Sequence, residues 1–255
     1  MKDILTDAYA IWAREIRRYF KLKLRIVGGL SQPLIYLIIM GFGFGSFITG
    51  LSPGTNYLEW FAPGIIGLTI LFTSLFAGVS VVWERQFGFL KEILVAPVKR
   101  ISITLGKIGG IVSISTLLSV IILAILLVTG IIPTFNIIAV FQTSGLIILT
   151  SIIFASLGVV IAAELNNVDI FQSMANFIAL PTFFLSTALF PIVDAPTWMQ
   201  WLAYLNPLTY AVDGMRGLLI GTYYISLPVD ILSLSIYAII LLASANMSIK
   251  SLKSR

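Results

Sequence analysis

The chain has 255 residues, of which 58% are hydrophobic and 11% are charged, and its mean hydropathy is +1.03, whereas a soluble domain carries roughly 25% charged residues. It contains no cysteine and no histidine, which excludes disulfides, thiol nucleophiles and the usual zinc ligand sets. The formal net charge of +5 comes from basic residues placed as membrane topology requires, so we expect no nucleic-acid partner.

Residues 1–25 predict an amphipathic helix that lies in the cytoplasmic membrane interface. Apolar residues recur at helical spacing opposite charged ones, with Trp12 and Tyr19 at headgroup depth. The apolar positions are Ile4, Leu5, Ala8, Ile11, Trp12, Ile16 and Phe20. The alternative is a basic flank that only sets topology, but the continuous apolar stripe favours the interfacial helix.

Six apolar stretches follow, each close to the roughly 20 residues that a membrane-spanning helix needs. They are residues 26–48, 61–83, 108–129, 137–163, 170–190 and 231–249. None contains Asp, Glu, Lys, Arg or His, whereas ion-coupled carriers and proton pumps usually keep such residues in their spans. We therefore expect the driving energy to come from elsewhere. Pro181, near the centre of the fifth stretch, should kink that helix.

Uncharged polar residues within the third and fifth stretches indicate a translocation path for a lipid-like or amphiphilic cargo. These residues are Ser113, Ser115, Thr116, Ser119, Gln172 and Asn176. The alternative is that the serines and the threonine bond only to the backbone of their own helix, as is common in membrane helices.

The basic residues set the expected orientation. All lysines and arginines except Arg216 fall in segments that share a side with the N-terminus, and an excess of Lys and Arg marks the cytoplasmic side. Both termini and residues 84–107 are therefore expected inside, and residues 191–228 outside. This predicts one transmembrane domain over residues 1–255, multi-pass in the cytoplasmic membrane.

Residues 84–107 form the only long charged segment between two apolar stretches. The spacing predicts a helix over residues 84–95, interrupted by no helix breaker except Gly88, with one apolar and one charged face. Its charged residues are Glu84, Arg85, Lys91 and Glu92. Two interpretations remain open: a plain interfacial helix, or a short helix that inserts into a soluble partner. We favour the second, because a polar insert between two spans is expensive without a function.

Residues 191–228 form the longest loop, which is unusually apolar. Tryptophans and leucines at 198–205 predict a short amphipathic helix, Asn206-Pro207 ends it, and a second helix runs from Tyr210 to Ile220. Asp213 and Arg216 lie three residues apart on that second helix, so their side chains can meet on one face. We expect them to form an ion pair, either within the helix or across a dimer, that stabilises the re-entrant turn. The alternative is that both side chains face water.

The residues do not favour catalysis by this chain. Without His and Cys no Ser-His-Asp or Cys-His set is possible, and no G-x-x-x-x-G-K-[ST] sequence is present to bind ATP. The first alternative, a membrane-embedded transferase, would need convergent charged residues at the membrane surface. The second, a passive channel, would need no docking helix.

Two sequence motifs stand out. The first runs from Glu84-Arg85 through Gly88, Lys91, Leu94, Ala96-Pro97-Val98 and Arg100 to Gly106-Lys107. The second is the run from Asn206-Pro207-Leu208-Thr209-Tyr210 to Gly221. Both resemble motifs of the type-2 ABC exporter permeases, and the drug-resistance permeases of the daunorubicin type are closest in pattern. Together with the N-terminal helix and six spans, the resemblance covers nearly the whole chain. The sequence departs from the pattern at Phe89, where Thr is usual, and at Lys91, where many relatives carry Glu.

The resemblance implies an all-α membrane protein that exports an amphiphilic or lipid-linked cargo, such as a drug, lipid or glycolipid. It implies a pair of permeases, here a homodimer, with two separate ATPase subunits that hold ATP and Mg, so no cofactor is expected on this chain. The residues implied for docking the ATPase are Glu84, Arg85, Gly88, Lys91, Glu92, Pro97, Lys99 and Arg100. Two short re-entrant helices before the last span would shape the exit in the outer leaflet. Their marked residues are Trp198, Trp201, Asn206, Pro207, Tyr210, Asp213 and Arg216.

Overall fold

A computed structural model describes residues 4–21, 23–44, 56–87, 99–132, 136–192 and 195–251. Within these ranges all regular structure is α-helical, as predicted. The helices are, in chain order, α1 (Ile4–Lys21), α2 (Lys23–Phe44), α3 (Tyr57–Ala77), α4 (Val79–Gln86), α6 (Arg100–Val128), α7 (Ile137–Glu164), α8 (Val168–Phe184), α9 (Thr197–Tyr204), α10 (Pro207–Ile220) and α11 (Leu227–Ser251).

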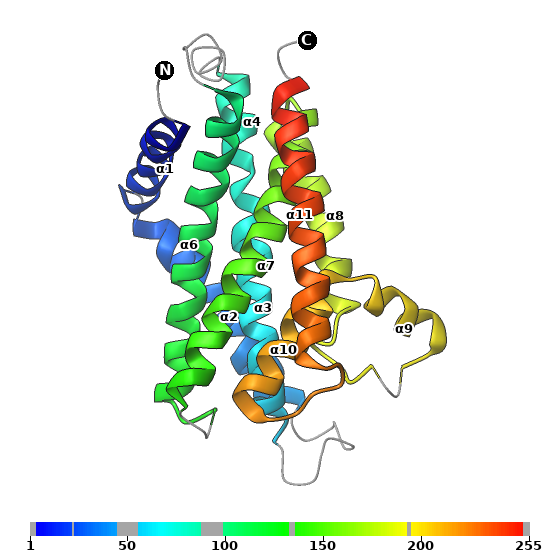
Figure 1. Ribbon diagram of the computed structural model, residues 1–255. Coiled ribbons are helices and arrows are strands. Elements are labelled where there is room, and N and C mark those ends of the chain that lie inside the picture. The colour runs from blue at the N-terminus through cyan, green and yellow to red at the C-terminus, as the bar shows by residue number, and fades with distance from the viewer. Residues whose placement is uncertain are drawn as a thin grey trace.

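The helices form a bundle around α3, which packs against α2, α6, α7, α8 and α10 (Figure 1). Side chains on every side of α3 are buried, because this helix is apolar all round, as is typical of a helix surrounded by other helices. Helix α1 and the C-terminal end of α11 lie toward one end of the bundle, and α10 lies toward the opposite end (Figure 1). We call the first end the inner end and the second the outer end.

Five helical segments of the described chain are long and apolar enough to cross a bilayer. They are Ile26–Gly43, Tyr57–Gln86, Arg100–Val128, Ile137–Glu164 and Leu227–Ser251. These segments correspond to five of the six predicted spans.

Within the remaining predicted span, residues 170–190, the described helix is α8, which covers Val168–Phe184. With 17 residues it is about 25 Å long, at the short end of the roughly 17–25 residues of membrane-spanning helices. Pro181 lies in its last turn and cannot donate a backbone hydrogen bond, and the helix ends at Phe184. The chain then turns back toward α10, where the Thr187 hydroxyl donates to the carbonyl of Thr209 at 3.2 Å.

The charged segment predicted over residues 84–107 is helical at both of its described ends. Helix α4 ends at Gln86, and residues 88–98 lie outside the described part of the chain. The third span begins earlier than predicted, at Arg100, because the polar side chains in its first turns are buried against neighbouring helices. Thr104, for example, is 1% exposed.

Helix α1 packs closely along α6, and two glycines permit this contact. A Cβ atom at Gly106 would lie 2.7 Å from the carbonyl oxygen of Ala8, and one at Gly110 would lie 2.7 Å from Cβ of Glu15. Glycines four residues apart on one helix let a second helix approach closely in this way. The indole N–H of Trp12 also donates to the hydroxyl of Ser113 at 3.0 Å. The contact holds α1 with Glu15 toward α6.

Candidate functional site

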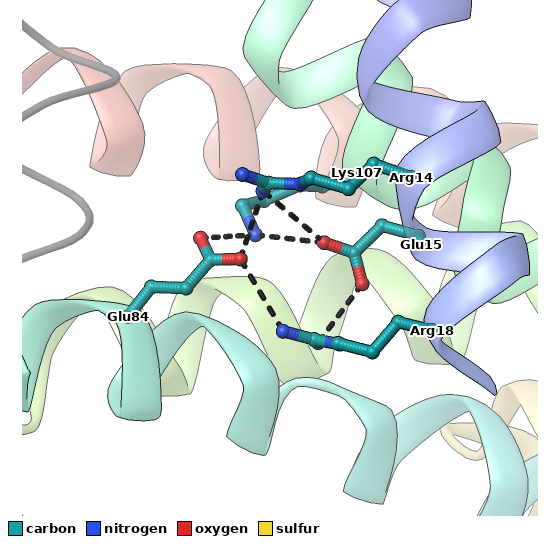
Figure 2. Close-up of polar contacts among 5 residues, drawn as sticks. All are labelled: Arg14, Glu15, Arg18, Glu84 and Lys107. Atoms are coloured by element: carbon teal, nitrogen blue, oxygen red, sulfur yellow. Dashed lines mark hydrogen bonds and ion pairs between the residues drawn. The ribbon is translucent and has the colours of Figure 1, made fainter. Parts of the chain in front are cut away.

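Three helices bring five charged side chains together at the inner end of the bundle (Figure 2). Helix α1 supplies Arg14, Glu15 and Arg18, α4 supplies Glu84, and α6 supplies Lys107. The ammonium of Lys107 lies 2.6 Å from Glu84 and 3.3 Å from Glu15. Arg14 lies 2.9 Å from Glu84, and Arg18 lies 2.9 Å from Glu15. Each cation also reaches the second carboxylate within 4.0 Å, and we call this set the inner charge cluster.

Burial explains why these charges are so fully paired. The side chains of Lys107, Glu84 and Glu15 are 1%, 6% and 7% exposed, whereas Arg14 and Arg18 are about half-exposed. A buried charge without a partner is strongly destabilising. Burial by itself raises the pKa of Glu15, but Lys107, Arg18 and Arg14 together outweigh it and hold this pKa below its ordinary value of 4.5.

Two other arginines near the charged segment bind the C-terminal ends of distant helices. Arg85 donates to the carbonyl of Ala163 at 2.6 Å, next to the end of α7, and Arg100 donates to the carbonyl of Ile249 at 3.4 Å, near the end of α11. Basic side chains satisfy the free carbonyls at helix C-termini and interact favourably with the helix dipole. Lys99, which precedes α6, is exposed.

The predicted docking residues are therefore divided by the structure. Glu84, Arg85 and Arg100 contact side chains or carbonyls of their own chain, and Lys99 is exposed. The other predicted docking residues, which lie outside the described residues, are Gly88, Lys91, Glu92 and Pro97.

Sequence reasoning quoted Lys107 as part of the family motif, but it did not place Lys107, Arg14, Glu15 or Arg18 beside Glu84. They come from the predicted interfacial helix and from the start of the third span, far from Glu84 in the sequence. One usable signal was the pair Arg14 and Arg18, four residues apart and flanking Glu15, which places an acidic residue among bases on one helix. A second usable signal was the position of Lys107 next to Gly106, the glycine at which α1 approaches α6 closely.

At the outer end, Arg216 on α10 is completely buried. Its guanidinium donates to the carbonyl of Thr187 at 2.7 Å and to that of Trp60 at 3.2 Å. It also lies 3.9 Å from the centre of the Trp60 ring, a distance at which a cation is attracted by the ring face. Arg216 thus joins α10 to the start of α3 and to the turn that follows α8.

Asp213 is also completely buried, and it joins α10 to the segment before α11. Its carboxylate accepts backbone hydrogen bonds from Tyr224 at 3.2 Å and from Ile225 at 2.8 Å. It lies 4.0 Å from Arg216, so the predicted ion pair is present at a long distance, and the alternative that both residues face water is wrong. Burial raises the pKa of Asp213, although these backbone donors and Arg216 lower it. We call Asp213, Arg216 and the groups they contact the outer anchor.

The other marked residues of the outer helices divide into anchoring and exposed positions. Asn206 caps α10 by accepting from the Leu208 N–H at 3.0 Å, with Pro207 in the first turn. Its side-chain amide also donates to the carbonyl of Thr182 in α8 at 2.6 Å. The Tyr210 hydroxyl donates to the backbone of α9 at 2.6 Å. Trp198 and Trp201 on α9 are exposed.

A cavity of about 460 Å³ lies beside the inner charge cluster, between α1, α2, α3, α6 and α8. Glu15 and Arg18 line it on the α1 side. Large apolar side chains line it on α3 and α6, including Phe72 and Leu118. A mostly apolar cavity of this size with a few polar groups is typical of a small-molecule site.

This cavity contains only some of the residues of the predicted translocation path. Gln172 and Asn176 of α8 line it. Two serines of α6 bond elsewhere: Ser113 donates to the carbonyl of Gly109 at 2.9 Å, and Ser115 accepts from Ser151 of α7 at 3.1 Å. The alternative interpretation, bonding to the backbone of the same helix, therefore holds for Ser113 but not for Ser115. The buried hydroxyls of Thr116 and Ser119 have no hydrogen-bond partner among the described residues.

Comparison with known proteins agrees with the two motifs. The family described as ABC-2 type transporter matches residues 6–220. The chain is 30% identical over 218 residues to the ycf38 protein of Pyropia yezoensis, covering 85% of this chain and 75% of that protein. It is 26% identical over 234 residues to Nodulation protein J of Rhizobium leguminosarum bv. viciae, covering 91% and 89%. It is 27% identical over 213 residues to the inner membrane transport permease YadH of Escherichia coli K12, covering 81% and 80%.

Proposed function

The chain belongs to the ABC-2 type transporter family as a transport permease without catalytic activity of its own, and on this premise we propose that it is the membrane subunit of an exporter. Permeases of this family pair with an ATPase subunit. We assign ATP and Mg to that partner and no cofactor to this chain. By analogy with YadH, which is named an inner membrane permease, we place it in the cytoplasmic membrane with both termini inside.

The observation that carries this proposal is the position of the inner charge cluster. It joins the interfacial helix α1 to α4 and α6, and these two helices flank residues 88–98 on either side. A force applied to that segment by a bound ATPase would therefore act on three helices at once. Residues 88–98 contain half of the residues implied for docking, namely Gly88, Lys91, Glu92 and Pro97, so we assign the ATPase contact to this segment.

This arrangement refines the roles of the docking residues. Lys91, Glu92 and Lys99 are assigned to direct contact with the ATPase, because Lys99 is exposed and the other two lie in the same charged segment. Glu84 and Arg85 are assigned a positioning role, because their charged groups bind their own chain.

The cargo is proposed to be amphiphilic or lipid-linked, and the permease is proposed to work as a homodimer. The cavity between α1, α2, α3, α6 and α8 combines apolar walls with a charged side, which suits an amphiphile. Gln172 and Asn176 are exposed on α8, and exposed amides are costly against lipid. A second copy packed near α8 would shield them and enclose the path.

Two experiments test the proposal. The ATPase encoded nearest to this chain should copurify with it, and a Lys91→Glu, Lys99→Glu variant should lose this partner while its melting temperature stays unchanged. Retention of the partner would contradict the assignment of the docking segment. For orientation, a cysteine introduced at Thr197 should react with an impermeant maleimide in intact cells and one at Lys99 should not. The reverse labelling would overturn the topology.

A further inference from the structure

The cavity beside the inner charge cluster has a charged end and an apolar body. Arg18 and Glu15 line the end at α1, and Phe72 and Leu118 belong to the body between α3 and α6. Because α1 is an amphipathic helix assigned to the membrane surface, this gradient runs from the interface toward the hydrocarbon region. A lipid in the inner leaflet has its charged group and its chain arranged in the same order.

The inner charge cluster carries an excess of positive charge. Its three cations and two carboxylates leave one net positive charge when all are ionised. Lys107 is buried between the two carboxylates, so the excess lies on the half-exposed guanidiniums of Arg14 and Arg18. Of these two arginines, Arg18 lines the cavity.

Arg18 also has donors to offer. A guanidinium carries five N–H groups in a planar fork. Nη2 of Arg18 donates to Glu15 at 2.9 Å and its Nη1 lies 3.6 Å from Glu84, which leaves further N–H groups of Arg18 for a ligand. Its side chain is 41% exposed. Arginine binds phosphate groups by paired, charge-assisted hydrogen bonds, which are stronger than neutral ones.

We propose that this cavity binds an anionic amphiphile, with its phosphate at Arg18 and its hydrocarbon chain along Phe72 and Leu118. A headgroup with one negative charge brings the net charge of the cluster and the ligand together to zero. The headgroup charge is therefore buried beside charges that balance it. A cationic amphiphile would meet the excess positive charge instead. The inference rests on the proposed function, because it names the class of cargo that the exporter takes from the inner leaflet.

Binding of two lysophospholipids tests the headgroup assignment. Lysophosphatidylglycerol is anionic and lysophosphatidylcholine is zwitterionic. Versions of both lipids with the same fluorescent acyl chain can be titrated into the full-length protein in an uncharged detergent. Both lipids carry the phosphodiester that would bind Arg18, so they differ in the quaternary ammonium of the zwitterionic lipid, which meets the excess positive charge of the cluster. The anionic lipid should therefore bind about tenfold more tightly. Equal affinities in the wild-type protein would overturn the proposal.

Variants of α1 locate the headgroup. Arg18→Gln should weaken the anionic lipid about tenfold. It should weaken the zwitterionic lipid less, because both lose the phosphate contact but the variant also removes a positive charge that repels the quaternary ammonium. Arg18→Lys, which keeps the charge, should lose less than Arg18→Gln. The matched control is Arg17→Gln, because Arg17 is on the same helix and donates to the carbonyl of Ala13 at 3.3 Å. Equal losses for Arg17→Gln and Arg18→Gln would indicate general surface charge and would overturn the assignment.

A third variant and a competitor test where the hydrocarbon chain of the lipid binds. Thr73 lines the cavity, so Thr73→Trp should fill it and weaken both lysolipids, and it gives an answer even where Arg18→Gln does not fold. Unchanged binding in Thr73→Trp would overturn the site. Glycerol phosphate alone should not displace the lipid, and displacement at equal concentration would show a simple anion site. Because these titrations need no ATPase, their result is independent of whether the chain copurifies with one.

Discussion

The molecule buries charged groups at both ends of its bundle, and the two ends hold them by different means. In the inner charge cluster, side chains on three helices pair with one another, and each cation reaches two carboxylates (Figure 2). In the outer anchor, Asp213 and Arg216 belong to one helix, lie 4.0 Å apart and are satisfied mainly by backbone groups.

The difference indicates what each end can do when the helices move. A cation shared between two carboxylates can exchange its partners during a small shift of a helix, so the inner charge cluster can stay paired while α1, α4 and α6 are displaced. Backbone donors and acceptors cannot be exchanged without moving the chain itself. We therefore interpret the inner end as the part that transmits motion and the outer end as a fixed turn.

The largest effect is expected for Lys107→Met at the inner end. It leaves two buried carboxylates without their shared ammonium, and removing one partner of a buried pair costs about 3–5 kcal/mol. Lys99→Met is the matched control, because Lys99 is exposed. Thermal unfolding of the detergent-solubilised proteins gives the measurement. Equal melting temperatures for the two variants would show that the cluster does not stabilise the fold.

A loss of similar size is expected for Arg216→Met at the outer end. The change removes the charged hydrogen bonds to the carbonyls of Trp60 and Thr187, each worth about 1.5–3 kcal/mol. Asp213 keeps its two backbone donors, just as Glu84 keeps Arg14 and Glu15 keeps Arg18 in Lys107→Met. The same thermal assay measures the loss, and a melting temperature unchanged from that of the wild-type protein would show that the outer anchor does not stabilise the fold.

Double-mutant cycles should separate the two ends further. Contacting residues show coupling energies of about 0.5–3 kcal/mol. We expect Glu84→Gln with Lys107→Met to lie near the top of that range, because the two groups are 2.6 Å apart. Asp213→Asn with Arg216→Met should lie near the bottom, because those groups are 4.0 Å apart. Additive losses at the inner end would refute direct pairing there.

The smallest expected difference between the two ends is in how their contributions to stability change at low pH. Burial raises the pKa of Glu15, but the nearby cations lower it more strongly, so this pKa lies below its ordinary value of 4.5. The contribution of Glu15 to stability is therefore present above the unfolded-state pKa and is lost as the pH falls through the folded-state pKa. Burial raises the pKa of Asp213, so its contribution is present at low pH and is lost as the pH rises through the folded-state pKa. Between pH 7 and pH 4, Glu15→Gln should lose less stability than the wild-type protein, and Asp213→Asn should lose more. Parallel pH profiles for all three proteins would contradict this assignment.

Local sequence signals predicted the outer end well. Asn206-Pro207 is a cap followed by a first-turn proline, and both act at the start of α10 as their residue types imply. Asp213 and Arg216 were found because three residues along a helix place two side chains on the same face. The apolar stretches likewise predicted five long helices from composition alone. These features depend on residues close together in the chain.

Features that depend on packing were not predicted. The inner charge cluster joins Glu15, Glu84 and Lys107, which are far apart in the sequence and meet only because α1 lies against α6. The end of α8 was misplaced because hydropathy does not reveal that the chain turns back after Phe184. Partners such as the Thr187 carbonyl, which binds Arg216, are equally invisible, since every residue has a carbonyl.

The most direct test of the central claim exchanges the charges of one pair in the inner charge cluster. Glu84→Lys alone should impair both copurification with the ATPase and ATPase activity of the reconstituted complex, because it places a fourth cation in the cluster. Adding Lys107→Glu restores opposite charges across the 2.6 Å contact, so the doubly exchanged protein should recover both properties. If the single and double variants are equally impaired while both melt like the wild-type protein, Glu84 acts on the ATPase directly, and the cluster is not the element that holds the coupling segment in place.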